Sequence, residues 1–247
     1  MALPTDPAFW FAVGQIILID ILLGGDNAIV IAMACRGLPE KQRKRGIFFG
    51  TMGAIAVRVM LIGFALTLLA LPYLKLVGAL LLVWIGIKLL TQEDESHEVN
   101  ASSKLWGAVK TIIIADLVMS VDNVVGVSGA AEAGGGDYKM TLVVLGLLVS
   151  IPIVVWGSTI VLRWLDRFPW LITVGGMLMG WIAGTMAVTD PAVMPYLPTE
   201  VLADATRKVD NVFYQAAGVV GAALVVMMAQ AKKRWGKGKE LDRELPP

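Results

Sequence analysis

The sequence predicts an all-α membrane protein with seven transmembrane helices, in which an inverted repeat of three plus three helices is followed by a seventh helix. Three observations support this fold class. Hydrophobic residues make up 57% of the 247 residues and charged residues only 17%, whereas soluble domains hold about 25% charged residues. The hydrophobic residues gather in blocks of about twenty, which is the length needed to cross a bilayer. Two of these blocks also resemble each other in sequence.

Seven hydrophobic blocks are expected to cross the membrane within a single transmembrane domain that takes in residues 1–247. Inside lipid every backbone N–H and C=O group needs an internal partner, so each block is expected to be a helix. In chain order the blocks cover residues 9–34, 46–70, 73–91, 105–131, 140–162, 169–188 and 209–231. No Lys or Arg precedes Arg36, so the first block lacks the positive segment of a cleaved signal peptide and is expected to remain in the protein.

The placement of Lys and Arg predicts the orientation, because positive residues are retained on the cytoplasmic side. Basic residues cluster in the connection at 34–46 and in the tail at 232–247, and others flank the connections at 92–104 and 163–168. The opposite side receives only Lys75, Lys139, Arg207 and Lys208. We therefore expect the N-terminus outside and the C-terminus in the cytoplasm, with 232–247 as a basic cytoplasmic tail.

The chain also repeats itself. A shift of 96 residues superimposes IILIDILLGGDNAIVIAMA (16–34) on IIIADLVMSVDNVVGVSGA (112–130), and a shift of 97 superimposes a VG-x5-WI pattern of the third span on the sixth. Each copy holds an odd number of spans, so the second copy enters the membrane from the opposite side. The sequence therefore predicts inverted repeats at 9–91 and 105–188, with the seventh helix at 209–231 outside the repeat.

The repeated polar residues are costly inside a membrane. Asp20 and Asp116 lie near the middle of the first and fourth spans, where a single Asp costs roughly 2.5–3.5 kcal/mol. Such residues mark functional sites by default, and a purely structural polar network between two helices is the alternative. The candidate metal ligands are the six repeated residues Asp20, Asp26, Asn27, Asp116, Asp122 and Asn123.

The chemistry of these residues favours a divalent cation. Carboxylate and amide oxygens are hard donors, which Mn²⁺, Mg²⁺ and Ca²⁺ prefer. A single Cys and a single His cannot build the clusters that zinc, copper or iron–sulfur sites need. Arg58 in the second span can neutralise one carboxylate, and the remaining charge needs cations or protons. We therefore expect a transported metal ion, protons as the candidate coupling ion, no cofactor and no nucleic-acid partner.

Helical spacing predicts how these groups meet. In each copy the first Asp, a small residue four positions later and an Asn seven positions later share one helix face. Asp26 would point about 120° away from that face in an unbroken helix, since successive residues turn by about 100°. A break at Gly24-Gly25 would bring Asp26 inward, so we expect one there, whereas Ser120-Val121 favours a break in the second copy less.

The motifs GGDN (residues 24–27) and DLVMSVDN (residues 116–123), in a chain of this length, resemble those of the TerC family, part of the LysE superfamily of exporters. The resemblance runs from about Phe9 to the seventh span, and the doubled D-x5-DN pattern is its specific part. The resemblance implies manganese efflux from the cytoplasm along a metal path through the four aspartates. An older description of the family is tellurium resistance. The second copy departs from the pattern by reading SVDN rather than GGDN.

Three classes of function are compatible with acidic residues inside a membrane. A divalent metal exporter, with Mn²⁺ favoured and Mg²⁺ or Ca²⁺ open, explains the repeat and the carboxylates together. An exporter of a small organic solute such as an amino acid is the alternative. It would need a positively charged side chain to bind the substrate carboxylate, and the middle of this chain holds a single Arg, Arg58. An intramembrane aspartyl protease expects YD and GxGD motifs, whereas Ile19 precedes Asp20 and Asp26 follows LGG. The chain is therefore expected not to be an enzyme.

Two further expectations concern assembly and location. Glycines at four-residue spacing in the sixth span, Gly176, Gly180 and Gly184, predict close helix packing, either within the chain or in a homodimer. The chain is expected to be a multi-pass protein of a cell membrane, the inner membrane of a bacterium.

Overall fold

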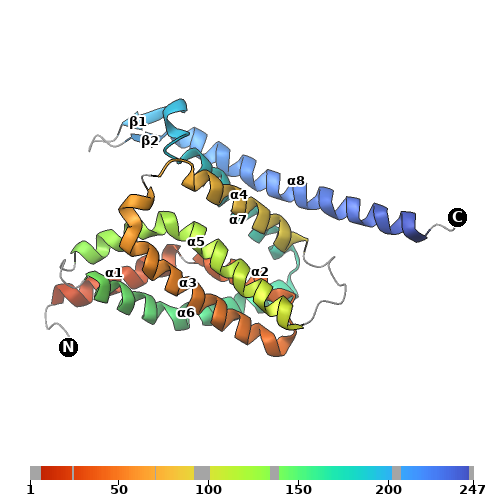
Figure 1. Cartoon of the computed structure of the whole chain (residues 1–247), viewed down its shortest axis with the longest axis horizontal. Helices are drawn as coiled ribbons and strands as arrows, with labels where there is room; N and C mark the ends of the chain where they lie inside the picture. The colour runs from red at the N-terminus through yellow and green to blue at the C-terminus, as the bar shows by residue number, and fades with distance from the viewer. Residues whose placement is uncertain are drawn as a thin grey trace. The chain divides into compact units, whose positions relative to one another are not determined.

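The computed structural model of the chain describes residues 7–23, 25–69, 71–91, 101–133, 139–201 and 207–244, some of them by their backbone alone. These residues are mostly helical, as predicted (Figure 1). The helices are α1 (Pro7–Leu23), α2 (Gly25–Arg36), α3 (Glu40–Leu69), α4 (Leu74–Leu90), α5 (Ala101–Ala133), α6 (Lys139–Arg167), α7 (Trp170–Val188) and α8 (Asn211–Glu244).

Most of the described residues in each of the seven hydrophobic blocks are helical. In the described part of the chain, three stretches are long and apolar enough to cross a membrane: Thr141–Arg167, Trp170–Val188 and Asn211–Trp235. The first block is divided, because α1 ends at Leu23 and α2 begins at Gly25. The break expected at Gly24-Gly25 involves Gly24, which lies outside the described residues, so the break stays a prediction. By contrast, α5 continues through Ser120 and Val121.

The connection between α7 and α8 differs from the all-α prediction. It holds a short 3₁₀ helix, η3 (Met194–Tyr196), and two strands, β1 (Thr199–Val201) and β2 (Arg207–Val209). The strands pair antiparallel, with Thr199 opposite Val209. Three-residue strands are too short to leave an alternating pattern in the sequence, which is why the ribbon was not predicted.

The helices divide into two compact units that alternate along the chain. The first unit contains α1, α2, α3, α5 and α6, and the second contains α4, α7, α8 and the β ribbon. The helices that the sequence repeat pairs with each other therefore lie in the same unit: α1 and α2 with α5, α3 with α6, and α4 with α7.

Close helix packing builds the first unit. A Cβ at Gly50 or Gly53 of α3 would lie 2.5 Å from the Cδ1 atom of Ile112 or Ile113 of α5, so the two glycines let α3 and α5 approach closely. On another side, Ile16 of α1 fills the space above Gly146 of α6. The core between α1 and α6 consists of Phe9, Val13, Ile16, Leu142, Val143 and Leu147.

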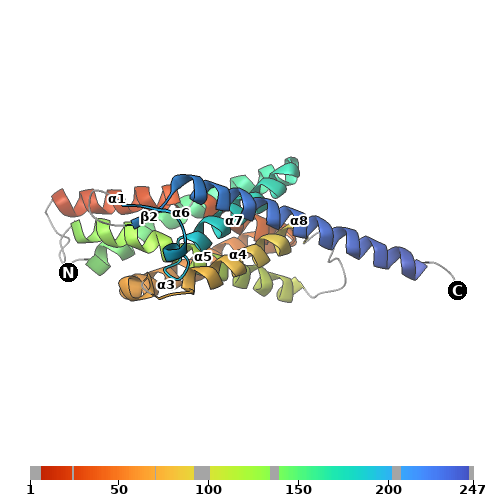
Figure 2. The same ribbon diagram turned by 90° about the horizontal axis from the view of Figure 1, so that it is seen from above.

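Glycines also build the second unit, in which α7 and α8 lie side by side (Figures 1 and 2). A Cβ at Gly184 of α7 would lie 2.0 Å from the carbonyl oxygen of Ala217 of α8. Gly176 of α7 faces Leu90 of α4, whose Cδ1 atom would lie 2.6 Å from such a Cβ. The glycines at four-residue spacing thus serve packing within one chain, and a homodimer is not needed to explain them.

Asp190, directly after α7, holds the start of α4. Its carboxylate accepts hydrogen bonds from the backbone N–H groups of Tyr73 (3.0 Å), Leu76 (3.1 Å) and Ala192 (2.7 Å). Tyr73 has a φ of 68°, a strained conformation for a bulky residue, and its bond to Asp190 helps to retain it. Burial alone raises the pKa of Asp190, but the N–H groups of Ala192, Tyr73, Leu76 and Lys75 stabilise the carboxylate more strongly. The pKa therefore lies below its ordinary value of 3.8.

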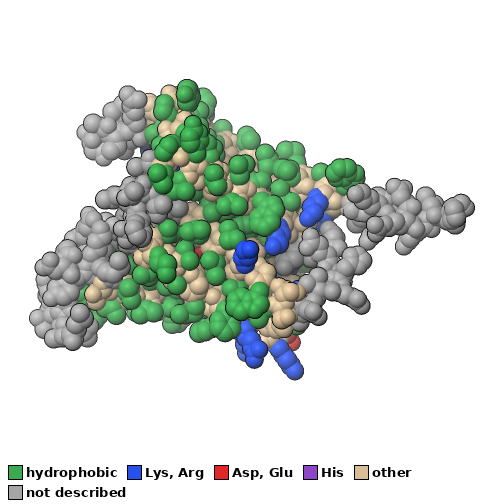
Figure 3. All heavy atoms as spheres, in the orientation of Figure 1, with side chains coloured by type: hydrophobic (Ala, Val, Ile, Leu, Met, Phe, Trp, Pro, Cys, Tyr) green, Lys and Arg blue, Asp and Glu red, His purple; other side chains and the backbone are tan. Residues whose placement is uncertain are grey.

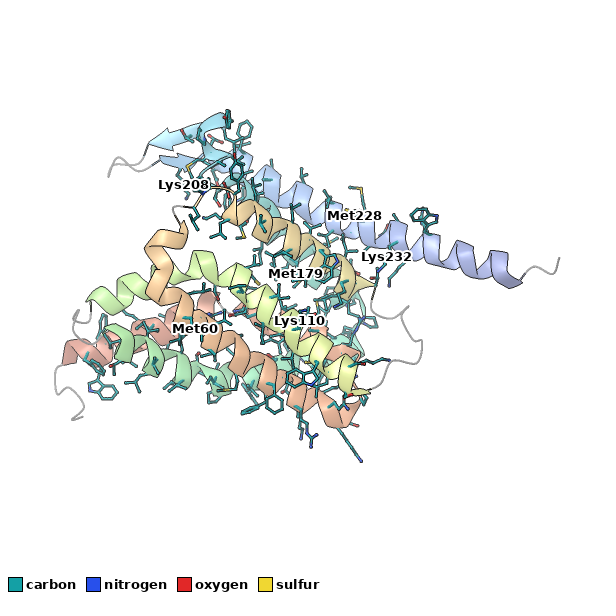
Figure 4. All side chains as sticks on the ribbon, viewed as in Figure 1. Met60, Lys110, Met179, Lys208, Met228 and Lys232 are labelled. Atoms are coloured by element: carbon teal, nitrogen blue, oxygen red, sulfur yellow. The ribbon has the colours of Figure 1, made fainter. Side chains whose placement is uncertain are left out.

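Large hydrophobic side chains are exposed on the helices, and hydrophobic side chains cover much of the visible face (Figure 3). Trp156 is 70% exposed, Leu80 70% and Met60 68%, as helices surrounded by lipid require. Figure 4 labels two methionines of the second unit with opposite surroundings. Met179 of α7 is buried, next to Gly86 of α4, whereas Met228 of α8 is exposed.

Candidate functional site

A buried ion pair joins α3 and α5 in the first unit. Arg58 Nη2 donates a hydrogen bond to Asp116 Oδ1 at 2.5 Å, and Arg58 Nε donates to Ser120 Oγ at 3.0 Å. Ser120 Oγ in turn donates to Asp116 Oδ2 at 3.0 Å. The three side chains therefore form a closed triangle, and each is buried. Two charges out of contact with solvent stabilise each other strongly only when hydrogen bonds also satisfy them, as they do here.

The triangle follows from helical spacing. Asp116 and Ser120 are four residues apart, so both lie on the face of α5 that meets α3, as the predicted stripe requires. Gly50 and Gly53 bring α3 close enough for the Arg58 side chain to reach them. From the sequence, Ser120 was predicted only to be a small residue on this face. A hydroxyl four residues after a buried Asp also indicates a hydrogen bond between the two side chains.

The start of α2 supplies the next candidate ligands. The backbone N–H of Asn27 donates to Asp26 Oδ1 at 2.8 Å. Asn27 is 6% exposed, and its Oδ1 atom has no hydrogen-bond partner among the described residues. Buried acceptors are nearly always hydrogen-bonded, so this oxygen is available for a ligand.

Asp26 lies within electrostatic range of both charges of the ion pair. Asp116 repels and Arg58 attracts its carboxylate. The structure thus brings Asp26, Asn27 and Asp116 into one region of the first unit, where α2 packs against α5. A cation there would meet carboxylate and amide oxygens from two helices, the donor set that hard divalent ions prefer.

The remaining predicted ligands lie on the same helices or on α1. Asp20 belongs to α1, and Asp122 and Asn123 belong to α5, but their side chains are outside the described residues. Among the side chains that the structure does describe, no three from His, Cys, Asp and Glu gather as a metal site would require. The complete six-residue ligand set therefore stays a prediction.

A second polar cluster joins the ends of three helices in the first unit. Arg43 Nη1, near the start of α3, donates to Asp166 Oδ2 of α6 at 2.6 Å. Arg43 also donates from Nε to the carbonyl oxygen of Leu38 and from Nη2 to that of Arg36. The sequence pattern used Arg43 only to predict the orientation of the chain in the membrane. In the structure it also donates hydrogen bonds to carbonyl oxygens at and just after the end of α2.

The buried hydroxyl of Thr51 was also not predicted from the sequence. Thr51 lies on α3, two turns before Arg58, and its Oγ1 atom has no hydrogen-bond partner among the described residues. A polar residue seven positions from a buried Arg falls near the same helix face, which is the signal that could have identified it.

Comparison with known proteins places the chain in a family. Residues 5–236 match the model of the integral membrane protein TerC family. The membrane protein YjbE of Bacillus subtilis is 43% identical over 175 residues, which cover 71% of this chain and 78% of YjbE. YceF of the same organism is 30% identical over 193 residues, covering 74% of this chain and 73% of YceF. The inner membrane protein YgdQ of Escherichia coli is 24% identical over 183 residues, covering 67% and 75%.

No solved structure matches the chain significantly. The family match extends from the beginning of α1 into the C-terminal part of α8, so it includes every helix described above. The relatives are membrane proteins, and within the described residues three helices are long and apolar enough to span a bilayer, so this is a multi-pass membrane protein. The chain belongs to the integral membrane protein TerC family, as its GGDN and DLVMSVDN motifs predicted.

Proposed function

We propose that this protein exports divalent metal cations, Mn²⁺ foremost, from the cytoplasm by alternating access, with protons moving inward as the coupling ion. The observation that carries this proposal is the buried Oδ1 atom of Asn27, which has no hydrogen-bond partner among the described residues and lies beside Asp26, whose carboxyl interacts electrostatically with Asp116. A dehydrated cation would give this oxygen the positive partner that no hydrogen-bond donor in the described part of the chain provides. The proposal also agrees with the export of manganese that the resemblance to the TerC family implies.

The binding site is proposed to combine both copies of the repeat. Asp26 and Asn27 of the first copy are joined by Asp122 and Asn123 of the second, and these are the main ligands. Asp20 and Asp116 lie six residues before Asp26 and Asp122 in the sequence and take part in loading and release. Oxygen ligands of this kind suit Mn²⁺, Mg²⁺ or Ca²⁺.

The distribution of the helices supports alternating access. Inverted repeats let one part of a transporter rock against another around a fixed site near the middle of the membrane. Here each helix lies in the same unit as its counterpart in the other copy, so both units have contributions from both copies. This arrangement is what two moving bodies built from a duplicated three-span unit require.

The contacts of Arg58 weigh against the two other function classes. An amino-acid exporter needs a positive partner for the substrate carboxylate, but Arg58 already donates to Asp116. An aspartyl protease needs two carboxyl groups that share a proton. Both oxygens of Asp116 accept hydrogen bonds from Arg58 or Ser120 instead, so Asp116 is a poor member of such a pair.

The metal content of cells tests this function. In a host that lacks its own exporters, expression of this chain should lower cellular manganese and raise tolerance of it, relative to the empty vector. Asp26→Asn should abolish the effect, and Asp210→Asn, the same change at the start of α8, should not. A metal profile that does not change, together with verified membrane insertion, would reject the proposed export.

A further inference from the structure

We propose that Arg58 is the built-in counter-ion of the empty transporter: its guanidinium holds Asp116 while no cation is bound, and an arriving cation displaces it. This inference rests on the proposed function and deepens it, because it names the group that neutralises Asp116 when the metal has left. Arg58 acts through Asp116 and is therefore a positioning residue.

The geometry of the triangle carries the proposal. A carboxylate inside a membrane needs a positive partner, and Arg58 supplies one from α3 through a direct hydrogen bond at 2.5 Å. The Arg58 side chain is 5% exposed and that of Asp116 is 8% exposed, so solvent does not screen the pair. Among the described residues, Asn27 Oδ1 has no hydrogen-bond partner. An ion pair that balances the Asp116 charge close to such an acceptor lets a cation replace the guanidinium without leaving a buried carboxylate uncompensated.

Ser120 limits how far the Arg58 guanidinium moves when a cation displaces it. Its hydroxyl accepts from Arg58 Nε and donates to Asp116 Oδ2. When a cation attracts Asp116, the guanidinium keeps its bond to Ser120 and need not leave the region. The planar fork of an arginine permits these two separate bonds, whereas the ammonium of a lysine is a point charge on a flexible stem.

The proposal separates two modes of transport. In metal-for-metal exchange, the transporter changes its access only while a cation is bound, so the empty state is never crossed. In net efflux it returns without metal, with the coupling protons on other carboxylates, and without Arg58 the buried Asp116 carboxylate would return without its guanidinium partner. Loss of the guanidinium should therefore slow net efflux and spare exchange.

The experiment uses the full chain in proteoliposomes and measures both modes with ⁵⁴Mn²⁺ on the same vesicles. Net efflux runs from loaded vesicles into metal-free buffer, and exchange runs with equal unlabelled Mn²⁺ on both sides. The ratio of the two rates does not depend on how much protein is active. We expect Arg58→Gln to lower this ratio by about tenfold or more, because an unpaired buried charge opposes the return step.

Two further variants complete the design. Arg58→Lys keeps the positive charge and folds without an unpaired carboxylate, and its ratio should lie between those of the wild type and Arg58→Gln. Arg163→Gln makes the same Arg-to-Gln change at an exposed position of α6 in the same unit, and should leave the ratio at the wild-type value.

The outcomes distinguish this inference from the proposed function. A wild type that exchanges ⁵⁴Mn²⁺, with both Arg58 variants showing an unchanged ratio, overturns the role of Arg58 and leaves metal export in place. Equal loss of both modes in Arg58→Gln and Arg58→Lys also overturns it, since that pattern indicates a structural role only. A wild type that moves no divalent metal in either mode overturns the proposed function and the inference with it.

Discussion

Gly180 of α7 and Gly221 of α8 face each other so closely that neither has room for a side chain. A Cβ on Gly180 would lie 2.4 Å from the carbonyl oxygen of Gly221, and one on Gly221 would lie 2.1 Å from the carbonyl oxygen of Gly180. Because these neighbours are backbone atoms, a methyl group can be accommodated only if the two helices move apart. In a membrane, where helix association depends on close packing, this contact holds the second unit together.

Gly180→Ala should therefore lower the stability of the protein by about 1–3 kcal/mol, the usual cost of overpacking a tight contact. Thermal unfolding in detergent measures this effect. The matched control is Gly157→Ala in α6, where a Cβ would meet no atom within 4 Å. That change should be neutral or stabilising, because Ala is the better helix former. Equal melting temperatures for the two variants would contradict the packing argument.

Asp190 should make stability depend on acid. Its pKa in the folded protein lies below the unfolded value of 3.8, so its contribution is complete above about pH 4 and is lost as the pH falls through the folded pKa. Asp190→Asn should remove this part of the acid dependence. It should also lower stability by about 1.5–3 kcal/mol, because charged acceptors make the stronger bonds.

The control for Asp190 is Asp210→Asn. Asp210 Oδ1 caps α8 by accepting a hydrogen bond from the N–H group of Val212 at 2.8 Å, and Asn caps helices about as well as Asp does. Melting curves of both variants between pH 3 and pH 7 provide the comparison. If Asp190→Asn melts with the same pH dependence as the wild type, the carboxylate is not the group that titrates.

Arg58 and Asp116 should be coupled in stability. Removing either partner breaks a buried ion pair, so Arg58→Gln and Asp116→Asn should each cost about 3–5 kcal/mol. The double variant carries neither charge and should cost clearly less than the sum of the two. A double-mutant cycle of unfolding free energies measures the coupling, and strict additivity would show that the two side chains do not interact.

Metal binding should depend on the start of α2. Asp26→Asn retains the shape of the side chain and removes one charge, so the affinity for Mn²⁺ should fall by more than about 100-fold, beyond the usual loss for a residue that only supports a ligand. Equilibrium binding of ⁵⁴Mn²⁺ to purified protein measures it, with Asp210→Asn as the control. Asp122→Asn should have the same effect if α5 supplies the equivalent ligand, and wild-type affinity in the double variant would exclude this site.

The distribution of basic residues predicts the topology. Reporters fused within 34–46 or after Lys239 should behave as cytoplasmic, and a reporter within 189–208 should behave as external. Labelling of the 34–46 connection from outside would reverse the orientation and remove the basis for export in the proposed direction.

The fold and the site differ in how far the sequence alone can predict them. Seven hydrophobic blocks predicted where helices occur, because the length of a bilayer-crossing helix leaves a strong one-dimensional signal. The same pattern could not show that α4 lies with α7 rather than with α3, since that arrangement depends on which small residues meet across helices. The β ribbon between α7 and α8 was missed for a different reason, because its strands are only three residues long.

The candidate site shows the same division. Depth and repetition singled out Asp116 and Asn27, and the i, i+4 spacing placed Ser120 on the face of Asp116. The ion pair of Arg58 with Asp116 was beyond the sequence, because four carboxylates were open to Arg58 and only the packing of α3 on α5 brings Asp116 to it. Asp190 was also missed, since its partners are backbone N–H groups that belong to no motif.

The separation of Arg58 from Asp116 along the chain has a consequence for how the protein is made. The two residues are 58 positions apart, so at about 5–20 residues per second the ribosome needs roughly 3–12 s to add the second after the first. During that interval the Asp116 carboxylate has not yet been made. The ion pair between α3 and α5 therefore closes only after α5 is synthesised, which makes the contact of these two helices a late step of assembly.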